Sequence, residues 1–343
     1  TSSKLRMSIK ELKRNKVSPI SGLIFILHRQ KMMKKIHLLV NLKSGSNKGE
    51  KALKQIETVL KDEKMDYDIH ISNYPGQLVP IATKVANEIS SRNEYVIVVG
   101  GDGSLNQALN GVKNSEQPNT PLAYFPAGTG NDFARAAKLE TDPLKLIRHL
   151  KNNPTVTKVD CGKYHDLING ETRYFVNNLG IGFDAYVVNK TNHSKLKTKF
   201  NKINIGNLTY GINIVQALKG QDNFKVRVSN NGHTSYYEHA YLVTTTNHPY
   251  FGGGVPILPI ASIHNHHLDI AIVEKPNLVK FIYLFSKLLI NGSHMKSNQF
   301  HYFESSAIEV KTDDPEYGQL DGEELSKRKF HLKFEVDHFD LLQ

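Results

Sequence analysis

The sequence has a single cysteine, Cys161, among its 343 residues. One cysteine excludes an internal disulfide framework and favours a reducing compartment, so we expect the protein in the cytoplasm. Long apolar runs are missing as well. The stretch 20–27 (ISGLIFIL) is too short to span a bilayer, and the apolar stretch 281–290 is interrupted by Lys287. The sequence therefore predicts no membrane-spanning segment.

The common nucleotide-binding signatures are also absent. No GxxxxGK[ST] motif occurs, and the stretch 98–106 (VVGGDGSLN) does not fit the GxGxxG spacing of dinucleotide-binding folds. Any bound nucleotide is therefore held by a different arrangement of glycines.

The net charge of +11 is unevenly distributed. Residues 1–31 hold eight lysines and arginines against Glu11 alone, a net of +7, which leaves +4 for the other 312 residues. Because the excess lies in one tail and no nucleic-acid-binding motif is present, we expect no nucleic-acid partner. The basic extension, residues 1–32, has three interpretations that stay open: an incidental extension, a membrane-surface anchor or a packed helix.

Hydrophobic patterning divides the chain in two. In the first part, strands and helices alternate, which predicts a three-layer α/β domain with a parallel sheet; strands are expected at 35–42, 66–72, 94–100 and after 121, and helices at 49–63, 75–90 and after 104. After residue 155 the chain is rich in alternating Val, Tyr and Thr, which predicts an antiparallel β-sandwich with helical material at 195–219 and 277–291. We therefore expect an α/β + β protein, with an α/β domain at 33–155 and a β-sandwich domain at 156–324.

Three glycine-rich stretches each follow a predicted parallel strand: 40–49 (VNLKSGSNKG), 98–106 (VVGGDGSLN) and 125–133 (FPAGTGNDF). Ligands of open parallel sheets bind outside the carboxyl ends of the strands, so we expect these three loops to meet at one site. Any one of them alone would be an ordinary turn. Together they favour the binding of phosphate by backbone N–H groups.

The motifs GGDGSLNQALNG (100–111), PAGTGNDFARA (126–136) and QLDGEE (319–324) occur in order along the chain. This set resembles the catalytic domain of diacylglycerol kinases, particularly the soluble bacterial lipid kinases, whose wider superfamily includes sphingosine, ceramide and NAD kinases. The resemblance implies an enzyme that uses ATP and Mg²⁺, with 33–155 as the nucleotide-binding domain and 156–324 as the lipid-substrate domain. Because the last motif lies more than 200 residues after the first, we expect the C-terminal segment, about 325–343, to return and complete the first domain.

The resemblance also implies which residues hold ATP. They provide backbone N–H groups and short hydroxyls against a polyphosphate. The matching positions are Asn41, Ser44, Gly45, Ser72, Gly100, Gly101, Asp102, Gly103, Ser104, Leu105, Asn106 and Thr129.

Four acidic residues match the acidic set of the family. Phosphoryl transfer needs Mg²⁺ on the phosphates and a group that accepts the proton of the attacking hydroxyl. The resemblance implies Glu323 as the general base, with Asp102 as the alternative, because related sphingosine kinases use that position. Asp132 and Asp160 are assigned to a metal and hydrogen-bond network around the phosphates. Each carboxylate taken alone would be an ordinary surface or capping residue.

The stretch 258–269 (LPIASIHNHHLD) departs from the family pattern. Relatives commonly hold a structural Mg²⁺ here through an aspartate that precedes a glycine, but this chain has Asn265 and His266 at those positions. Losing a carboxylate weakens the binding of a hard cation, so only a weak metal site is expected at Asn265. A zinc site at His264, His266 and His267 is disfavoured, because no cysteine is near and the spacing matches no zinc motif.

The substrate is the least determined feature. By resemblance we expect the substrate to be a lipid at the membrane surface, and diacylglycerol ranks first among the candidate lipids. A basic and apolar stretch favours peripheral membrane contact; it contains Lys195, Leu196, Lys197, Lys199, Phe200, Lys202 and Ile203. A solvated helix face explains the same stretch, and a homodimer is kept as an option. Two other functions stay open: a kinase for a soluble substrate such as NAD, and a non-catalytic nucleotide- or lipid-binding regulator.

Overall fold

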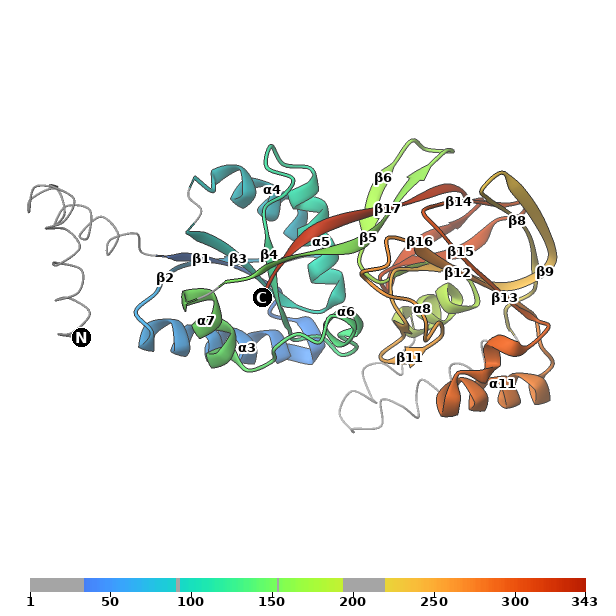
Figure 1. Cartoon of the computed structure of the whole chain (residues 1–343), viewed down its shortest axis with the longest axis horizontal. Helices are drawn as coiled ribbons and strands as arrows, with labels where there is room; N and C mark the ends of the chain where they lie inside the picture. Colours follow the sequence, from blue (N-terminus) through green and yellow to red (C-terminus); the bar gives the residue numbers. More distant parts are fainter. Residues whose placement is uncertain (1–33, 91–92, 153, 194–219) are drawn as a thin grey trace, which may run out of the picture.

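The computed structural model describes residues 34–343 except 91–92, 153 and 194–219. The basic extension, the helix expected at 195–219 and the lysine-rich stretch that begins at Lys195 lie outside the described residues. Figure 1 shows two halves, one of helices around parallel strands and one of antiparallel strands, joined by two long strands that run side by side.

The N-terminal half is the predicted α/β unit. Its parallel strands lie in the order β2 (Asp66–Ile71), β1 (Lys35–Val40), β3 (Glu94–Gly100) and β4 (Leu122–Pro126). Helices cover both faces, which explains why β1 and β3 are apolar almost throughout instead of alternating. One face packs against α3 (Ser44–Asp62) and α7 (Pro143–Asn152), and the other against α4 (Leu78–Glu88) and α5 (Asp102–Lys113).

The C-terminal strand β17 (His331–Leu342) joins the halves. It pairs antiparallel along its whole length with β5 (Val156–Asp166), and Leu341 pairs parallel with Leu122 of β4. The return of the C-terminal segment to the first domain is thereby confirmed. The sheet is continuous from one half into the other, while the predicted domain boundaries at 155 and 324 stay a prediction.

The second half consists of antiparallel strands, as predicted. Its strands enclose a separate apolar core; they are β6 (Thr172–Phe175), β7 (Asn178–Gly182), β8 (Phe224–Asn230), β9 (His233–Thr246), β12 (Leu268–Glu274), β13 (Phe300–Ser305), β14 (Ala307–Thr312), β15 (Glu316–Leu320) and β16 (Glu323–Arg328), with the short pair β10 (Tyr250–Phe251) and β11 (Val255–Pro256). Helical elements are α6 (Asp132–Ala136) at the junction, α8 (Phe183–His193), the 3₁₀ turn η1 (Ser293–Lys296) and α11 (Leu278–Asn291), which confirms the helix expected at 277–291. Within the described part of the chain, no helix is long and apolar enough to cross a bilayer.

The position of α5 depends on close packing against α4. A Cβ atom on Gly111 of α5 would lie 2.4 Å from the carbonyl oxygen of Val79 and 2.7 Å from Cβ of Ala82. The side chain of Thr83 also donates a hydrogen bond to the carbonyl oxygen of Gly111, at 2.8 Å. A residue without a side chain is therefore required where the two helices touch.

We predict that Gly111→Ala destabilises the protein, because the added methyl group forces the helices apart. Overpacking of this kind typically lowers the free energy of unfolding by about 1–3 kcal/mol, which urea denaturation measures. The control is Lys84→Ala on the exposed side of α4. A G111A protein as stable as the wild type would contradict this packing.

Candidate active site

The three glycine-rich loops meet, as the sequence predicts. A Cβ atom on Gly128 would lie 2.6 Å from Cα of Gly101, and a Cβ atom on Gly45 would lie 2.4 Å from the carbonyl oxygen of Ala127. Larger residues would separate these backbones. The glycines therefore hold the loops after β1, β3 and β4 against one another at the carboxyl edge of the sheet.

The first loop has an unusual backbone. Gly45, Ser46 and Asn47 all lie in the left-handed region, with φ of 57°, 59° and 74°. Successive residues with such backbones often form concavities that bind anions through their N–H groups. The side-chain amide of Asn41 donates to the hydroxyl of Ser104 at 3.4 Å, which links this loop to the start of α5.

The structure distributes the residues predicted to hold ATP over several environments. Gly100, Gly101 and Gly103 surround the start of α5. Thr129 lines a cleft beside this helix start. Ser72 follows β2, and its backbone N–H donates to the carbonyl oxygen of Val40. Leu105 and Asn106 are buried. The amide of Asn106 donates to the carbonyl oxygen of Tyr174 and to Oδ2 of Asp321, each at 2.8 Å, so its side chain serves an internal role.

Asp102 lies at the centre of the site. Its carboxylate accepts hydrogen bonds from the backbone N–H of Asp132 at 2.8 Å, the N–H of Phe133 at 3.3 Å and the hydroxyl of Tyr124 at 3.4 Å. Burial raises the pKa of Asp102 to about 6, although the N–H donors favour its charged form. These bonds fix the start of α6 against the start of α5.

Asp132 connects the two halves of the protein. Its Oδ1 accepts a hydrogen bond from the guanidinium of Arg135, and its Oδ2 accepts the backbone N–H of Gly253 at 2.9 Å. Gly253 belongs to the second half and has a φ of 91°. The carboxylate thus holds a glycine-rich turn of the second half above the first.

The QLDGEE motif enters the site from the second half. Oε1 of Glu323 accepts a hydrogen bond from the side-chain amide of Gln107 at 2.7 Å and lies 3.5 Å from the position of a Cβ on Gly103. Its neighbour Asp321 accepts the backbone N–H groups of three consecutive residues, Val176 to Asn178, at 2.8–2.9 Å. Burial raises the pKa of Asp321 to about 7.

A cleft of about 390 Å³ lies between these groups. Both halves contribute acidic and amide side chains to its wall: Asp102, Asp132, Asn177, Asn178, Asp184, Gln319 and Asp321. Burial raises the pKa of Asp184 to about 6, and its Oδ1 has no hydrogen-bond partner among the described residues. The sequence analysis did not identify Asp184, Asp321 or the two asparagines as site residues. Asp321 could have been found, because it is the aspartate of the QLDGEE motif.

Asp160 does not line the cleft. Its Oδ2 accepts the backbone N–H of His266 at 2.7 Å, and its Oδ1 lies 2.9 Å from Nδ1 of the same histidine. Oδ1 of Asn265 accepts the backbone N–H of His267. These hydrogen bonds fix the stretch 258–269 against Asp160, and the weak metal site expected at Asn265 stays a prediction.

Family models match both halves of the chain. Residues 35–164 match the model described as the diacylglycerol kinase catalytic domain, and residues 177–338 match the YegS C-terminal NAD kinase beta sandwich-like domain. YtlR, a candidate lipid kinase of Bacillus subtilis (strain 168), is 28% identical over 301 residues, which are 86% of this chain and 94% of that protein. The diacylglycerol kinase of Staphylococcus carnosus (strain TM300) is 30% identical over 295 residues, 85% of this chain and 89% of that protein.

Solved structures agree with these sequence relatives. The crystal structure of a candidate diacylglycerol kinase from Bacillus anthracis str. Sterne superimposes with a TM-score of 0.69 at 25% identity. The superposition covers 90% of this chain and 94% of that one.

One wall of the cleft rests on an uncharged histidine. Nε2 of the buried His248 donates to Oδ1 of Asn177 at 2.7 Å, and its Nδ1 accepts the backbone N–H of Tyr250 at 3.2 Å. Burial lowers the pKa of His248 to about 3. Protonation would turn Nδ1 from an acceptor into a donor and break the second bond.

We predict that this histidine destabilises the fold in acid. Its pKa is about 6.5 in the unfolded chain, so as pH falls below that value only the unfolded state gains the proton. Between pH 7 and pH 5 the loss is about 2 kcal/mol. The free energy of unfolding is measured by urea denaturation at both pH values. Its fall from pH 7 to pH 5 should be smaller by about this amount in His248→Gln than in the wild type. In the exposed control His233→Gln, the fall should equal that of the wild type. Equal pH dependence in all three proteins would contradict the prediction.

Proposed function

The chain belongs to the diacylglycerol kinase catalytic-domain family of lipid kinases. On that premise we propose that it transfers the γ-phosphate of ATP to a lipid hydroxyl, and that diacylglycerol is the favoured acceptor. Such a reaction would take place at a membrane surface, which the protein would reach by peripheral contact. The relatives named diacylglycerol kinase favour this substrate.

The observation that carries the proposal is the adjacency of a polar cleft and an apolar cavity. Asp184, Val187 and Phe251 line both of them. The remaining wall of the cavity is almost entirely aliphatic and aromatic. A lipid acceptor has the matching chemistry, because its hydroxyl suits the polar cleft and the first carbons of its chain suit the apolar cavity of about 100 Å³. A soluble dinucleotide acceptor would have no use for such a cavity.

The glycine loops fit a polyphosphate. Neither loop has a side chain where Gly101 and Gly128 touch, and the left-handed backbone from Gly45 to Asn47 offers N–H donors beside them. Asp102 and Asp132 offer carboxylate oxygens next to this cradle, which suits a hard cation. When bound, Mg²⁺ would neutralise the charge that develops on the phosphates.

Two carboxylates are candidates for accepting the proton of the lipid hydroxyl: Asp102, which lines the cleft, and Glu323, which follows the cleft-lining Gly322. Glu323 is our choice of general base, because one of its oxygens is held by Gln107 and the other has no hydrogen-bond partner among the described residues. Asp102 is the alternative. Its two oxygens already accept backbone N–H groups, which favours a role in holding the loops.

We predict that Glu323→Gln lowers kcat about 10²–10⁴-fold, the range typical for loss of a general base. The assay is the transfer of γ-labelled phosphate from ATP to a panel of lipids in mixed micelles, with NAD as a soluble acceptor. The matched control is Glu335→Gln on β17, an exposed carboxylate paired with Lys163.

Each outcome of this assay has one meaning. Transfer to a lipid that is lost in E323Q and kept in E335Q supports the proposal and names the substrate. Full activity of E323Q with loss in Asp102→Asn would move the base to Asp102. Transfer to NAD alone, or binding of ATP without transfer to any acceptor, would overturn the lipid kinase in favour of a soluble-substrate kinase or a regulator.

A further inference from the structure

Helix α11 is apolar on two opposite faces. Its inner face lines the apolar cavity with residues at helical spacing, namely Phe281, Leu284, Phe285 and Leu288. Its outer face follows the same spacing and is exposed: Val279 (79% exposed), Ile282 (58%), Tyr283 (54%), Leu289 (56%) and Ile290 (78%). A helix that packs on a water-exposed surface has one apolar face, so the second face of α11 requires an apolar partner.

Charge around α11 indicates the kind of partner. Residues 275–303 contain four lysines and no aspartate or glutamate. At 100° per residue, Lys280 and Lys287 both lie along one edge of the outer face, and Nζ of Lys287 lies 4.4 Å from the ring centroid of Tyr283. Exposed apolar side chains flanked by lysines, with aromatic rings among them, are typical of helices that lie in the interface of an anionic membrane.

The place of α11 in the fold gives this surface a use. Figure 1 shows the helix at the outer end of the second half, away from the helices of the first. Its inner face closes the cavity that adjoins the polar cleft. A lipid that leaves the bilayer beside α11 would therefore meet the cavity before the cleft.

We propose that α11 docks on an anionic bilayer surface with its outer face and that the cavity beneath it, about 100 Å³ in volume, receives the first carbons of the acceptor lipid's chain. The occupation of the cavity by an acceptor lipid rests on the proposed function. The docking of α11 on a bilayer does not depend on catalysis.

The test measures vesicle binding by the full chain. Vesicles of phosphatidylcholine with phosphatidylglycerol are compared with phosphatidylcholine alone. We expect preference for the anionic vesicles, and at least about tenfold weaker binding by the double variant Val279→Ser/Ile290→Ser, which removes two exposed apolar side chains. The control is Ile168→Ser, an exposed apolar residue (58%) in the turn after β5. Urea denaturation verifies that the variants stay folded.

Three outcomes would overturn the docking: no vesicle binding by the wild type, equal binding by the double variant, or a wild-type dimer in sedimentation that the double variant dissociates. The last would mean that a second copy covers the face. Activity is measured separately on a short-chain acceptor below its micellar concentration. If no acceptor is phosphorylated while vesicle binding behaves as expected, the proposed function fails and the docking stands.

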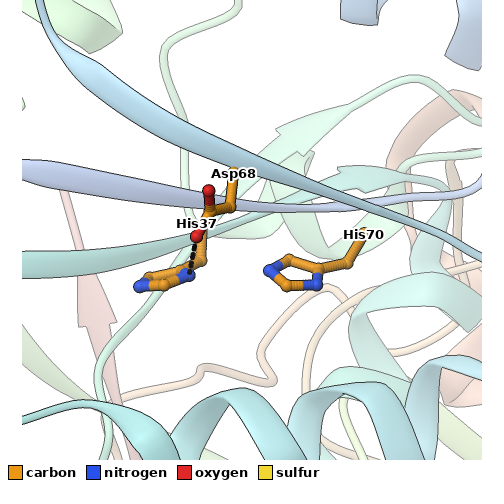
Figure 2. A group of neighbouring side chains, drawn as sticks. All are labelled: His37, Asp68 and His70. Atoms are coloured by element: carbon orange, nitrogen blue, oxygen red, sulfur yellow. Dashed lines mark ion pairs between the residues drawn. The ribbon is translucent and has the colours of Figure 1, made fainter.

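A second, independent observation concerns two histidines and an aspartate on β1 and β2. Asp68 pairs with His37 in the parallel register, and His70 lies two residues further on the same face of β2. Figure 2 shows the three side chains turned toward one another, and one donor atom from each lies within 4.8 Å of the other two. The two rings stack with centroids 5.8 Å apart.

One ring nitrogen of each histidine has no hydrogen-bond partner among the described residues. Nδ1 of His37 and Nε2 of His70 are buried and accept no hydrogen bond from the described residues. Nε2 of His37 lies 3.1 Å from Oε2 of Glu94, so a proton on that nitrogen leaves Nδ1 with a free lone pair. A histidine oriented by a carboxylate behind it is the usual second layer of a metal site.

We infer that His37, Asp68 and His70 bind a divalent transition metal of the zinc class. Two imidazoles and a carboxylate are the donors that such ions prefer, and Mg²⁺ does not favour nitrogen ligands. Oδ2 of Asp68 lies 3.8 Å from Nδ1 of His37 and also 2.6 Å from Nζ of Lys35, so the ion would compete with Lys35 for this oxygen. The bound ion would clamp the edge strand β2 to β1.

The probe is Co²⁺ added to the full chain without an affinity tag, followed by its visible absorption and by competition with Zn²⁺. We expect one equivalent to bind, a higher melting temperature with Zn²⁺, and at least about tenfold weaker binding by His70→Gln. The control is the exposed His165→Gln. Failure of the wild type to bind Co²⁺, or equal binding by H70Q, would overturn the inference.

Discussion

The site depends on one buried carboxylate, that of Asp321. It accepts three consecutive backbone N–H groups from residues 176–178 and a side-chain N–H from Asn106 of α5. A carboxylate buried without these donors would be strongly destabilising. With them it joins the turn between β15 and β16, the start of β7 and the helix after the second glycine loop. Glu323 follows two residues later, so the same bonds place it over the start of α5.

The cleft concentrates negative charge. Burial raises the pKa of Asp102, Asp184 and Asp321 above the ordinary range of a carboxyl group. Backbone donors offset this for Asp102 and Asp321, whereas Oδ1 of Asp184 has no partner in the described structure. Such a cluster is typical of sites that bind cations or polarise hydroxyl groups. The adjoining apolar cavity favours hydroxyl groups that are attached to hydrocarbon chains.

Much of this architecture follows from the sequence. Alternating strands and helices predict the parallel sheet, and glycine stretches after three strands predict where the loops meet, because both depend on local patterns. The roles of individual polar residues depend on contacts across more than 100 residues and could not be predicted. Asn106 serves Asp321 inside the protein, and Asp160 is engaged by His266, whose φ of 59° places its ring and N–H on the same carboxylate. The family pattern alone assigned both residues to the phosphate site.

The most direct test of the account is mass spectrometry of the lipids after the full chain is incubated with ATP, Mg²⁺ and anionic vesicles that contain diacylglycerol. The account predicts phosphatidic acid and ADP in equal amounts, because the phosphoryl group passes from the nucleotide to the lipid hydroxyl. Release of ADP and inorganic phosphate without any phosphorylated lipid would contradict it.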